Sequence, residues 1–231
     1  MKIGIIAAMP EELVYLIQHL DEASEEKVLG NSYYTGKIGS VELVLVESGI
    51  GKVMSAMSVA ILADHFQVDA VINTGSAGAV ANGIAVGDVV IADKLAYHDV
   101  DVTAFGYEYG QMAQQPLYFE SDKKFINLIQ ESLSKLDQTW HLGLIATGDS
   151  FVAGEDKIKA IKEHFPQVLA VEMEGAAIAQ AAQALNLPFL VVRAMSDNAN
   201  HEASVSFDEF IVEAGRRSAQ ALMTLLQSIK D

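Results

Sequence analysis

The sequence predicts an α/β fold with a central mixed β-sheet flanked by helices, organised as a single domain. Short apolar runs alternate with amphipathic segments along the chain, which is typical of a sheet with helices packed on its faces. The chain has 231 residues, 51% of them hydrophobic, which suits one α/β domain with a sizeable core. No internal repeat, low-complexity tract or linker interrupts it, so residues 1–231 are expected to form one domain.

The expected strands are short apolar runs bounded by glycine or polar residues. From the N-terminus they cover Lys2–Ala8, Tyr33–Ile38, Val41–Glu47, Ala70–Thr74, Val86–Ala96, Gly143–Thr147, Ala170–Glu172 and Phe189–Ala194. The second and third of these form a hairpin that turns at Gly39 and Ser40, because glycine tolerates the positive φ of a tight turn.

The expected helices are the amphipathic segments between these strands. They cover Glu11–Gln18, Lys52–His65, Lys123–Leu136, Glu155–His164, Glu174–Leu185 and Phe207–Ile229. The last of them is predicted from its apolar residues at helical spacing, which are Phe210, Ile211, Ala214, Ala221, Leu222 and Leu225.

The stretch Tyr97–Phe119 fits neither the strand nor the helix period. A loop of this length inside a compact domain is usually functional or disordered, and its aromatic content argues against disorder. Exposed aromatic residues mark ligand pockets and oligomer interfaces, so we expect one or both here. The alternative is a long loop that packs against its own residues and has no function.

The composition excludes several classes of function. There are 31 acidic and 15 basic residues, and a net charge of −16 repels nucleic acid and anionic lipid. The chain has no cysteine, which excludes disulfides, zinc–thiolate sites and thiol nucleophiles. No stretch reaches the about 18 uninterrupted apolar residues of a membrane span, and the apolar N-terminal run is too short for an export signal. The protein is therefore expected in the cytoplasm, away from membranes and nucleic acid.

Candidate carboxylates follow the first strand and the strand near residue 172. Glu12 lies close to the start of a predicted helix, directly after the first strand, and Glu174 lies at the start of another. Acidic residues favour helix N-termini, so both could serve as helix caps alone. In open α/β sheets, however, ligands bind in the crevice at the carboxyl ends of the strands. A carboxylate placed there can accept hydrogen bonds from the vicinal hydroxyls of a ribose.

Two further segments place polar residues at strand ends. Arg193 interrupts an apolar strand, which is costly unless the guanidinium is paired, and the glutamates at neighbouring strand ends are its candidate partners. Ser196 and Asp197 follow it, although Asp197 could be a turn or cap residue. The segment Asn73–Gly78 is rich in small residues and lets backbone approach a ligand, but it is neither a phosphate loop nor a dinucleotide fingerprint.

Metal binding is the competing interpretation of this acidic cluster, because clustered carboxylates suit Mg²⁺ or Ca²⁺. No ligand spacing such as DxDxDG or HExxH is present, and Arg193 offsets part of the charge that a metal requires. A site without metal or cofactor is therefore the expectation.

Taken in order, these segments resemble the bacterial 5′-methylthioadenosine/S-adenosylhomocysteine nucleosidases of the nucleoside phosphorylase-like superfamily. The resemblance covers nearly the whole chain, and its specificity lies in the order and spacing of the motifs. The motifs are KIGIIAAMPEE at 2–12, SGIGKV at 48–53, INTGSAG at 72–78, HDVDVTAFGYEYGQ at 98–111, GD-F at 148–151, VEMEGAAIA at 171–179, RAMSD at 193–197 and SFDEF at 206–210. The family is metal-free and homodimeric, with active sites shared between the subunits.

The resemblance implies a role for each main residue. Glu12 is similar to the general base that activates the attacking water, assisted by Arg193 and Ser76, and Asp197 to the acid that protonates adenine N7. Glu174 is similar to the residue that binds the ribose 2′- and 3′-hydroxyls. The other implied contacts to the nucleoside substrate are Ala8, Met9, Ile50, Ala77, Gly78, Phe151, Val152, Glu172, Met173, Ser196 and Phe207, with Val102 and Phe105 reaching into the partner's 5′ pocket.

The implied activity is hydrolysis of the N-glycosidic bond of 5′-methylthioadenosine and S-adenosylhomocysteine, with 5′-deoxyadenosine as a further substrate. Two carboxyl groups, one assisting the leaving group and one activating water, suit an oxocarbenium-like transition state. Ala79 replaces a glycine of many members and Gln114–Pro116 differs in the 5′ region, which leaves the preference between the substrates open. A purine nucleoside phosphorylase and a non-catalytic nucleoside sensor are the alternatives.

Overall fold

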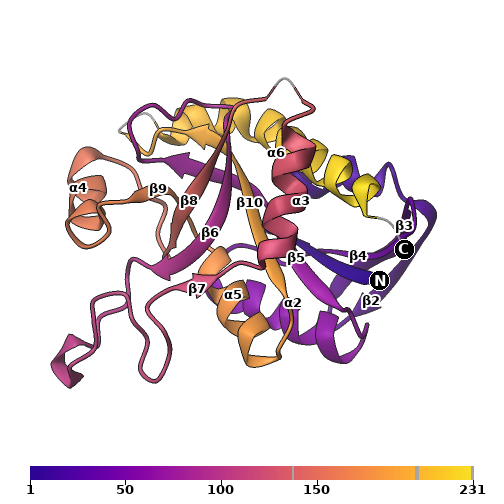
Figure 1. The fold of residues 1–231 in the computed structure, drawn as a ribbon, viewed down its shortest axis with the longest axis horizontal. Helices are drawn as coiled ribbons and strands as arrows, with labels where there is room; N and C mark the ends of the chain where they lie inside the picture. Colours follow the sequence, from indigo (N-terminus) through magenta and orange to yellow (C-terminus); the bar gives the residue numbers. More distant parts are fainter. Residues whose placement is uncertain (137, 201–202, 230–231) are drawn as a thin grey trace.

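The chain folds around one central β-sheet of parallel and antiparallel strands (Figure 1). The computed structural model describes residues 1–136, 138–200 and 203–229. Within these residues the strands are β1 (Lys2–Ala7), β2 (Asp21–Val28), β3 (Asn31–Ile38), β4 (Val41–Glu47), β5 (Ala70–Ala79), β6 (Val89–Tyr97), β7 (Phe119–Glu120), β8 (Trp140–Thr147), β9 (Val168–Glu172) and β10 (Phe189–Asp197). The α/β prediction with a central mixed sheet is confirmed.

The sheet closes on itself at one end. Strands β2, β3, β4, β1 and β5 follow one another, and β5 then pairs with both β9 and β10. Because β9 pairs with β8, β8 with β6 and β6 with β10, these five strands form a closed ring. Within the ring, β5 pairs with both β10 and β9. Gly75 is paired with Arg193, and Gly78 is paired with Val171 and with Asp197. This register gathers distant parts of the sequence around residues 73–78.

Helices cover both faces of the sheet, because alternate side chains of the central strands are apolar on both sides. The helices are α1 (Pro10–Ile17), α2 (Lys52–Asp64), α3 (Lys123–Leu133), α4 (Glu155–His164), α5 (Gly175–Ala184) and α6 (Ala203–Ser228). In β1, Ile3 and Ile5 join the core under α1, α3 and α6, whereas Ile6 joins the core under α2 and α5. Figure 1 shows α6 and α3 on one side of the sheet and α2 and α5 on the other.

Strand β2 is the main element that the sequence did not predict. All its side chains except that of Val28 are exposed, so the segment DEASEEKV carries no apolar alternation. It is held instead by backbone pairing with β3 at the edge of the sheet. Its acidic side chains also protect that edge from pairing with other chains.

Three predicted boundaries were wrong near the candidate site. Strand β5 continues to Ala79 and does not end at Thr74, because its small residues fit between β9 and β10. Strand β10 likewise runs on to Asp197, past the predicted end at Ala194. Helix α6 begins at Ala203, four residues before the predicted start at Phe207, in a segment (ASVS) whose residues show no helical apolar period.

The segment between β6 and β7 projects from the body of the molecule (Figure 1). It contains one 3-10 turn, Thr103–Phe105, whose residues are not buried. Among the described residues, no helix is both long enough and apolar enough to span a membrane.

Helix α6 approaches α1 closely at Gly215, which yields a test of the packing that positions the site. A Cβ atom at this glycine would lie 2.7 Å from the Glu11 carbonyl oxygen and 3.0 Å from the Glu12 Cα atom. We predict that Gly215→Ala lowers the free energy of unfolding by about 1–3 kcal/mol, because backbone atoms must move to admit the methyl group. Urea denaturation measures the effect. The matched control Val212→Ala, at an exposed position of the same helix, should stay within about 0.5 kcal/mol of wild type. A stabilised Gly215→Ala variant would contradict the packing.

Candidate active site

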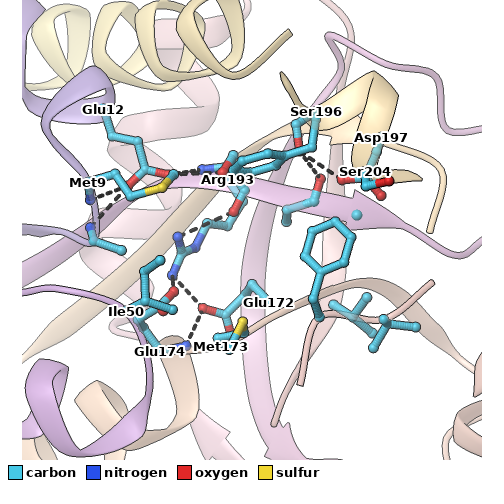
Figure 2. Close-up of a pocket in the computed structure, with 18 of the residues that line it drawn as sticks. Met9, Glu12, Ile50, Glu172, Met173, Glu174, Arg193, Ser196, Asp197 and Ser204 are labelled. Carbon is cyan, nitrogen blue, oxygen red and sulfur yellow. Dashed lines mark hydrogen bonds and ion pairs between the residues drawn. The ribbon is translucent and has the colours of Figure 1, made fainter. Parts of the chain in front are cut away.

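A cavity of about 460 Å³ lies where β5, β9 and β10 meet the N-terminal ends of α1 and α6. Its lining includes every residue that the sequence assigned to one subunit's site. These are Ala8, Met9, Glu12, Ile50, Ser76, Ala77, Gly78, Phe151, Val152, Glu172, Met173, Glu174, Arg193, Ser196, Asp197 and Phe207. Figure 2 shows Glu12 and Asp197 toward opposite ends of the cavity, with Arg193 between them in the view.

Glu12 is buried in the first turn of α1, and four donors fix its carboxylate. Oε2 accepts hydrogen bonds from the backbone N–H groups of Ala8 (3.0 Å) and Met9 (3.2 Å). Oε1 accepts from the backbone N–H (2.8 Å) and the hydroxyl (2.9 Å) of Ser76. The bond to Met9 is the backward-reaching half of a capping box. Glu12 therefore caps its own helix and presents a fixed carboxylate to the cavity.

Arg193 is the buried cation of the site. Its Nη2 atom donates to Asn73 Oδ1 (2.6 Å), to Glu174 Oε2 (3.2 Å) and to Glu172 Oε2. Its Nη1 atom donates to the Ser76 carbonyl at 3.3 Å. The predicted pairing of Arg193 with glutamates at neighbouring strand ends is thus confirmed.

Arg193 also supports Glu12 through Ser76, which accepts from the guanidinium and donates to the carboxylate. The two charged groups approach each other across Gly75. At this position φ is +149°, and a Cβ atom would lie 2.6 Å from Arg193 Nη1 and 2.7 Å from Glu12 Oε1. Glycine is required here because any side chain would separate the two groups.

Glu172 anchors the start of α5. Its Oε2 atom accepts from the backbone N–H groups of Glu174 (3.0 Å) and Gly175 (2.7 Å), and its Oε1 atom accepts from the Thr147 hydroxyl. The same hydroxyl accepts from the backbone N–H of Ala176 at 2.8 Å. Glu172 therefore satisfies helix N–H groups that would otherwise be unpaired, and it fixes the backbone that carries Glu174.

Glu174 is a buried carboxylate whose pKa is strongly raised. Its Oε1 atom accepts from the backbone N–H of Gly51 at 2.8 Å, and Oε2 accepts from Arg193. Burial raises the pKa of Glu174 from 4.5 to about 7, against the lowering effect of Arg193 and with a further rise from the charge of Glu172. At neutral pH this carboxyl group is close to the midpoint of its titration.

Asp197 lies at the end of β10, among neutral donors. Its Oδ1 atom accepts from the backbone N–H of Ala199 (2.7 Å) and its Oδ2 atom from the Ser196 hydroxyl (2.9 Å). Burial raises the pKa of Asp197 above its ordinary range, although both hydrogen bonds oppose the rise. A carboxyl group with a raised pKa is suited to act as an acid.

The remaining wall of the cavity is mostly apolar, with Met9, Ile50 and Met173 among its residues. The rings of Phe151 and Phe207 meet edge to face, with centroids 5.8 Å apart. A flat aromatic ligand together with a thioether suits such a lining.

The sequence missed four residues that line the cavity, which are Ser150, Val171, Ser204 and Asp208. Ser150 and Val171 each neighbour a predicted site residue. Ser204 and Asp208 lie three residues before and one residue after Phe207, and Ser204 falls in the part of α6 that precedes the predicted start of this helix.

Val102 and Phe105 are not among the residues that line this cavity. They lie in the projecting segment between β6 and β7, where the Phe105 side chain is 82% exposed. Among the described residues, no group of three or more His, Asp or Glu side chains is arranged to hold a metal ion.

Comparisons with known proteins agree over nearly the full length of the chain. The family model described as the Phosphorylase superfamily matches residues 2–228. Curated 5′-methylthioadenosine/S-adenosylhomocysteine nucleosidases from Listeria monocytogenes and Shewanella pealeana are 47% and 44% identical, over 99% of this chain and 100% of theirs.

Solved structures extend this similarity to the fold. A 5′-methylthioadenosine/S-adenosylhomocysteine nucleosidase from Streptococcus pneumoniae, solved with a transition-state inhibitor, is 82% identical with a TM-score of 0.98 and full coverage of both chains. The nucleosidase from Neisseria meningitidis in complex with methylthio-immucillin-A is 41% identical, with a TM-score of 0.97 over 99% of both chains.

The raised pKa of Glu174 predicts a pH dependence of stability. A carboxyl group whose pKa is about 7 in the folded state and 4.5 ordinarily binds its proton more tightly when folded. Its contribution to stability is therefore present below about pH 4.5 and is lost as the pH rises to about 7. We predict that the unfolding free energy of wild type falls between pH 5 and 7 more steeply than that of Glu174→Gln, by about 1 kcal/mol per pH unit. Urea denaturation at pH 5, 6 and 7 measures the two slopes, and parallel profiles would contradict the assignment.

Proposed function

The chain belongs to the phosphorylase superfamily and, within it, to the 5′-methylthioadenosine/S-adenosylhomocysteine nucleosidases. We propose a role for each main active-site residue in the reaction of this family. The enzyme hydrolyses the N-glycosidic bond of these two nucleosides and releases adenine and the 5′-thioribose product. The observation that carries our assignment of roles is the separation, in one cavity, of two buried carboxyl groups with different surroundings, Glu12 and Asp197.

In our assignment Asp197 assists the leaving group. The bond between ribose C1′ and adenine N9 breaks, and its electron pair goes to the base. A proton from Asp197 on N7 turns that base into a neutral leaving group. The raised pKa of Asp197 supports this role, because burial keeps the proton on the carboxyl group at higher pH. Ser196 orients the acid through its hydroxyl group.

Glu12 then activates the water that attacks C1′. The water oxygen bonds to the oxocarbenium-like carbon, and one water proton passes to a carboxylate oxygen of Glu12. The four donors on Glu12 fix its orientation in advance, which is the geometric requirement for a general base. Arg193 and Ser76 hold the base, and the Ser76 hydroxyl can rotate to free a lone pair on Oε1.

The nucleoside is bound by its sugar and its base on separate surfaces. Glu174 accepts hydrogen bonds from the ribose 2′- and 3′-hydroxyls, with Met173 packed against the sugar. Phe151 stacks on adenine and the backbone of Val152 reads its edge. The apolar side chains of Met9, Ile50 and Phe207 take the 5′-thioether. Because this contact is apolar, 5′-deoxyadenosine is also a substrate.

We propose that the active enzyme is a homodimer in which Val102 and Phe105 complete the partner's 5′ pocket. Helix α2 exposes apolar side chains on one face, with Val53 70% and Met57 48% exposed, beside Ile50 at the cavity. Contiguous exposed apolar residues mark protein interfaces. The projecting segment that carries Phe105 supports the same arrangement, since its aromatic side chain has no buried place in its own subunit.

Phosphorolysis is disfavoured by the charges around the cavity. A phosphate nucleophile needs cationic groups near the first strand, but Glu12 occupies that position. Arg193, the cation among the described residues that line the cavity, is already paired with Glu172 and Glu174. A sensor that only binds nucleosides would have no need for a fixed carboxylate such as Glu12.

The roles of the two carboxyl groups are tested by replacing each with its amide. We predict that Glu12→Gln and Asp197→Asn each lower kcat for 5′-methylthioadenosine by about 100- to 10,000-fold, because shape is kept while proton transfer is lost. Adenine release is followed chromatographically in phosphate-free buffer, and binding by calorimetry. Activity within a few-fold of wild type would remove the residue from the mechanism. A strict requirement of the wild type for phosphate would contradict the hydrolytic route.

The shared site is tested by mixing variants. Phe105→Ala should raise KM for 5′-methylthioadenosine about tenfold, because the 5′-thioether loses an apolar contact. In a heterodimer with inactive Glu12→Gln, the site that retains Glu12 receives Phe105 from its partner. We therefore predict that excess Glu12→Gln subunits restore the KM of the Phe105→Ala protein toward the wild-type value. An unchanged KM after subunit exchange, verified by native mass spectrometry, would exclude the shared pocket.

A further inference from the structure

We propose that Asp149 is a positioning residue for Glu174, which it holds in place through the Gly51–Lys52 peptide. The proposal rests on the assignment of Glu174 to the ribose hydroxyls and adds a residue that does not itself line the cavity. Asp149 comes just before Ser150 and Phe151, on the loop that follows β8.

The backbone N–H of Gly51 is the closest donor to Glu174. It lies 2.8 Å from Oε1, whereas Arg193 Nη2 lies 3.2 Å from Oε2 and also donates to Asn73 and Glu172. The position of the Glu174 carboxylate therefore depends on how the Gly51 peptide is held. Figure 2 shows Ile50, the residue before Gly51, next to Glu174.

Gly51 adopts a left-handed backbone conformation directly before α2. Its φ is +97°, in the region that residues with side chains rarely adopt. Asp149 Oδ1 accepts a hydrogen bond from the backbone N–H of Lys52 at 3.0 Å. It thus caps the N-terminus of α2 from 97 residues away along the chain and fixes the peptide that joins Gly51 to the helix.

Asp149 is itself held by Asp99 and Lys52. Its backbone N–H donates to Asp99 Oδ2 at 2.8 Å, and Lys52 Nζ lies 2.9 Å from Asp99 and 3.5 Å from Asp149. The side chain of Asp149 is 52% exposed. Ion pairs at such exposed positions contribute little energy. The capping hydrogen bond to Lys52 is therefore the contact that carries the effect on Glu174.

The rival explanation is that Asp149 only supports the loop with Phe151, which stacks on adenine. Two ligands separate these explanations. Adenine contacts the stacking residue and lacks the sugar, whereas 5′-methylthio-7-deazaadenosine has both parts. The latter also lacks the N7 atom that must be protonated for cleavage, so it remains intact during equilibrium titration.

Calorimetric titration of both ligands tests the proposal. We expect Asp149→Ala to weaken binding of the deazanucleoside about fivefold, the effect of losing a helix cap, and to leave adenine binding unchanged. In the Glu174→Ala background the same substitution should cause no further loss. Asp149→Asn should bind within about twofold of wild type, because its amide oxygen can accept from Lys52 N–H. Asp156→Ala, an exposed residue in the first turn of α4, is the matched control and should match wild type.

Equal loss of affinity for adenine and for the deazanucleoside would overturn the proposal, as would independent effects of Asp149→Ala and Glu174→Ala. If Asp149→Ala does not fold by circular dichroism, Asp149→Leu removes the acceptor of the Lys52 backbone N–H while keeping a side chain of similar length. It should cause the same loss, again confined to the deazanucleoside, and a loss shared with adenine would again be decisive. Failure of the ribose assignment itself has a different signature, because Glu174→Ala would then bind the deazanucleoside as tightly as wild type.

Discussion

The buried guanidinium of Arg193 is the contact on which the rest of the site depends. It lies at the centre of the β10 pairing with β5 and holds Glu172 and Glu174 at the end of β9. It also reaches Glu12 through Ser76. A buried charge is tolerated only when it is paired and hydrogen-bonded. Here the pairing joins three strands, so the arrangement of the sheet and the spacing of the carboxylates are set together.

One arginine does not balance three buried glutamates, and the ends of three helices supply the remaining stabilisation. Glu12 accepts from the backbone at the start of α1, Glu172 at the start of α5, and Glu174 from the residue that precedes α2. Helix N-termini carry partial positive charge and unpaired N–H groups, so each favours a carboxylate. The helix-cap and active-site interpretations of Glu12 and Glu174 are therefore compatible, because the same contacts serve both.

The sequence predicted the fold and the composition of the cavity better than the contacts within it. Alternating apolar strands and motif order were sufficient for the sheet, its helices and the lining residues from Ala8 to Phe207. Strand β2 was missed because its exposed residues carry no apolar signal. The bonds from Gly51 to Glu174 and from Thr147 to Glu172 join residues 123 and 25 positions apart. Such contacts follow from the order of the strands across the whole sheet, which local patterns do not encode.

The surroundings of Asp197 and Glu174 differ in the charge placed beside each carboxyl group. Both are buried, and burial raises the pKa of each. Arg193 favours the charged form of Glu174, whereas the partners of Asp197 among the described residues are a backbone N–H and a hydroxyl group. In the proposed mechanism, ribose hydroxyls donate to Glu174 and favour its ionised form, while adenine N7 accepts from Asp197 and favours its protonated form. In this proposal the nucleoside itself sets the two protonation states, which ties proton placement to correct binding of both the sugar and the base.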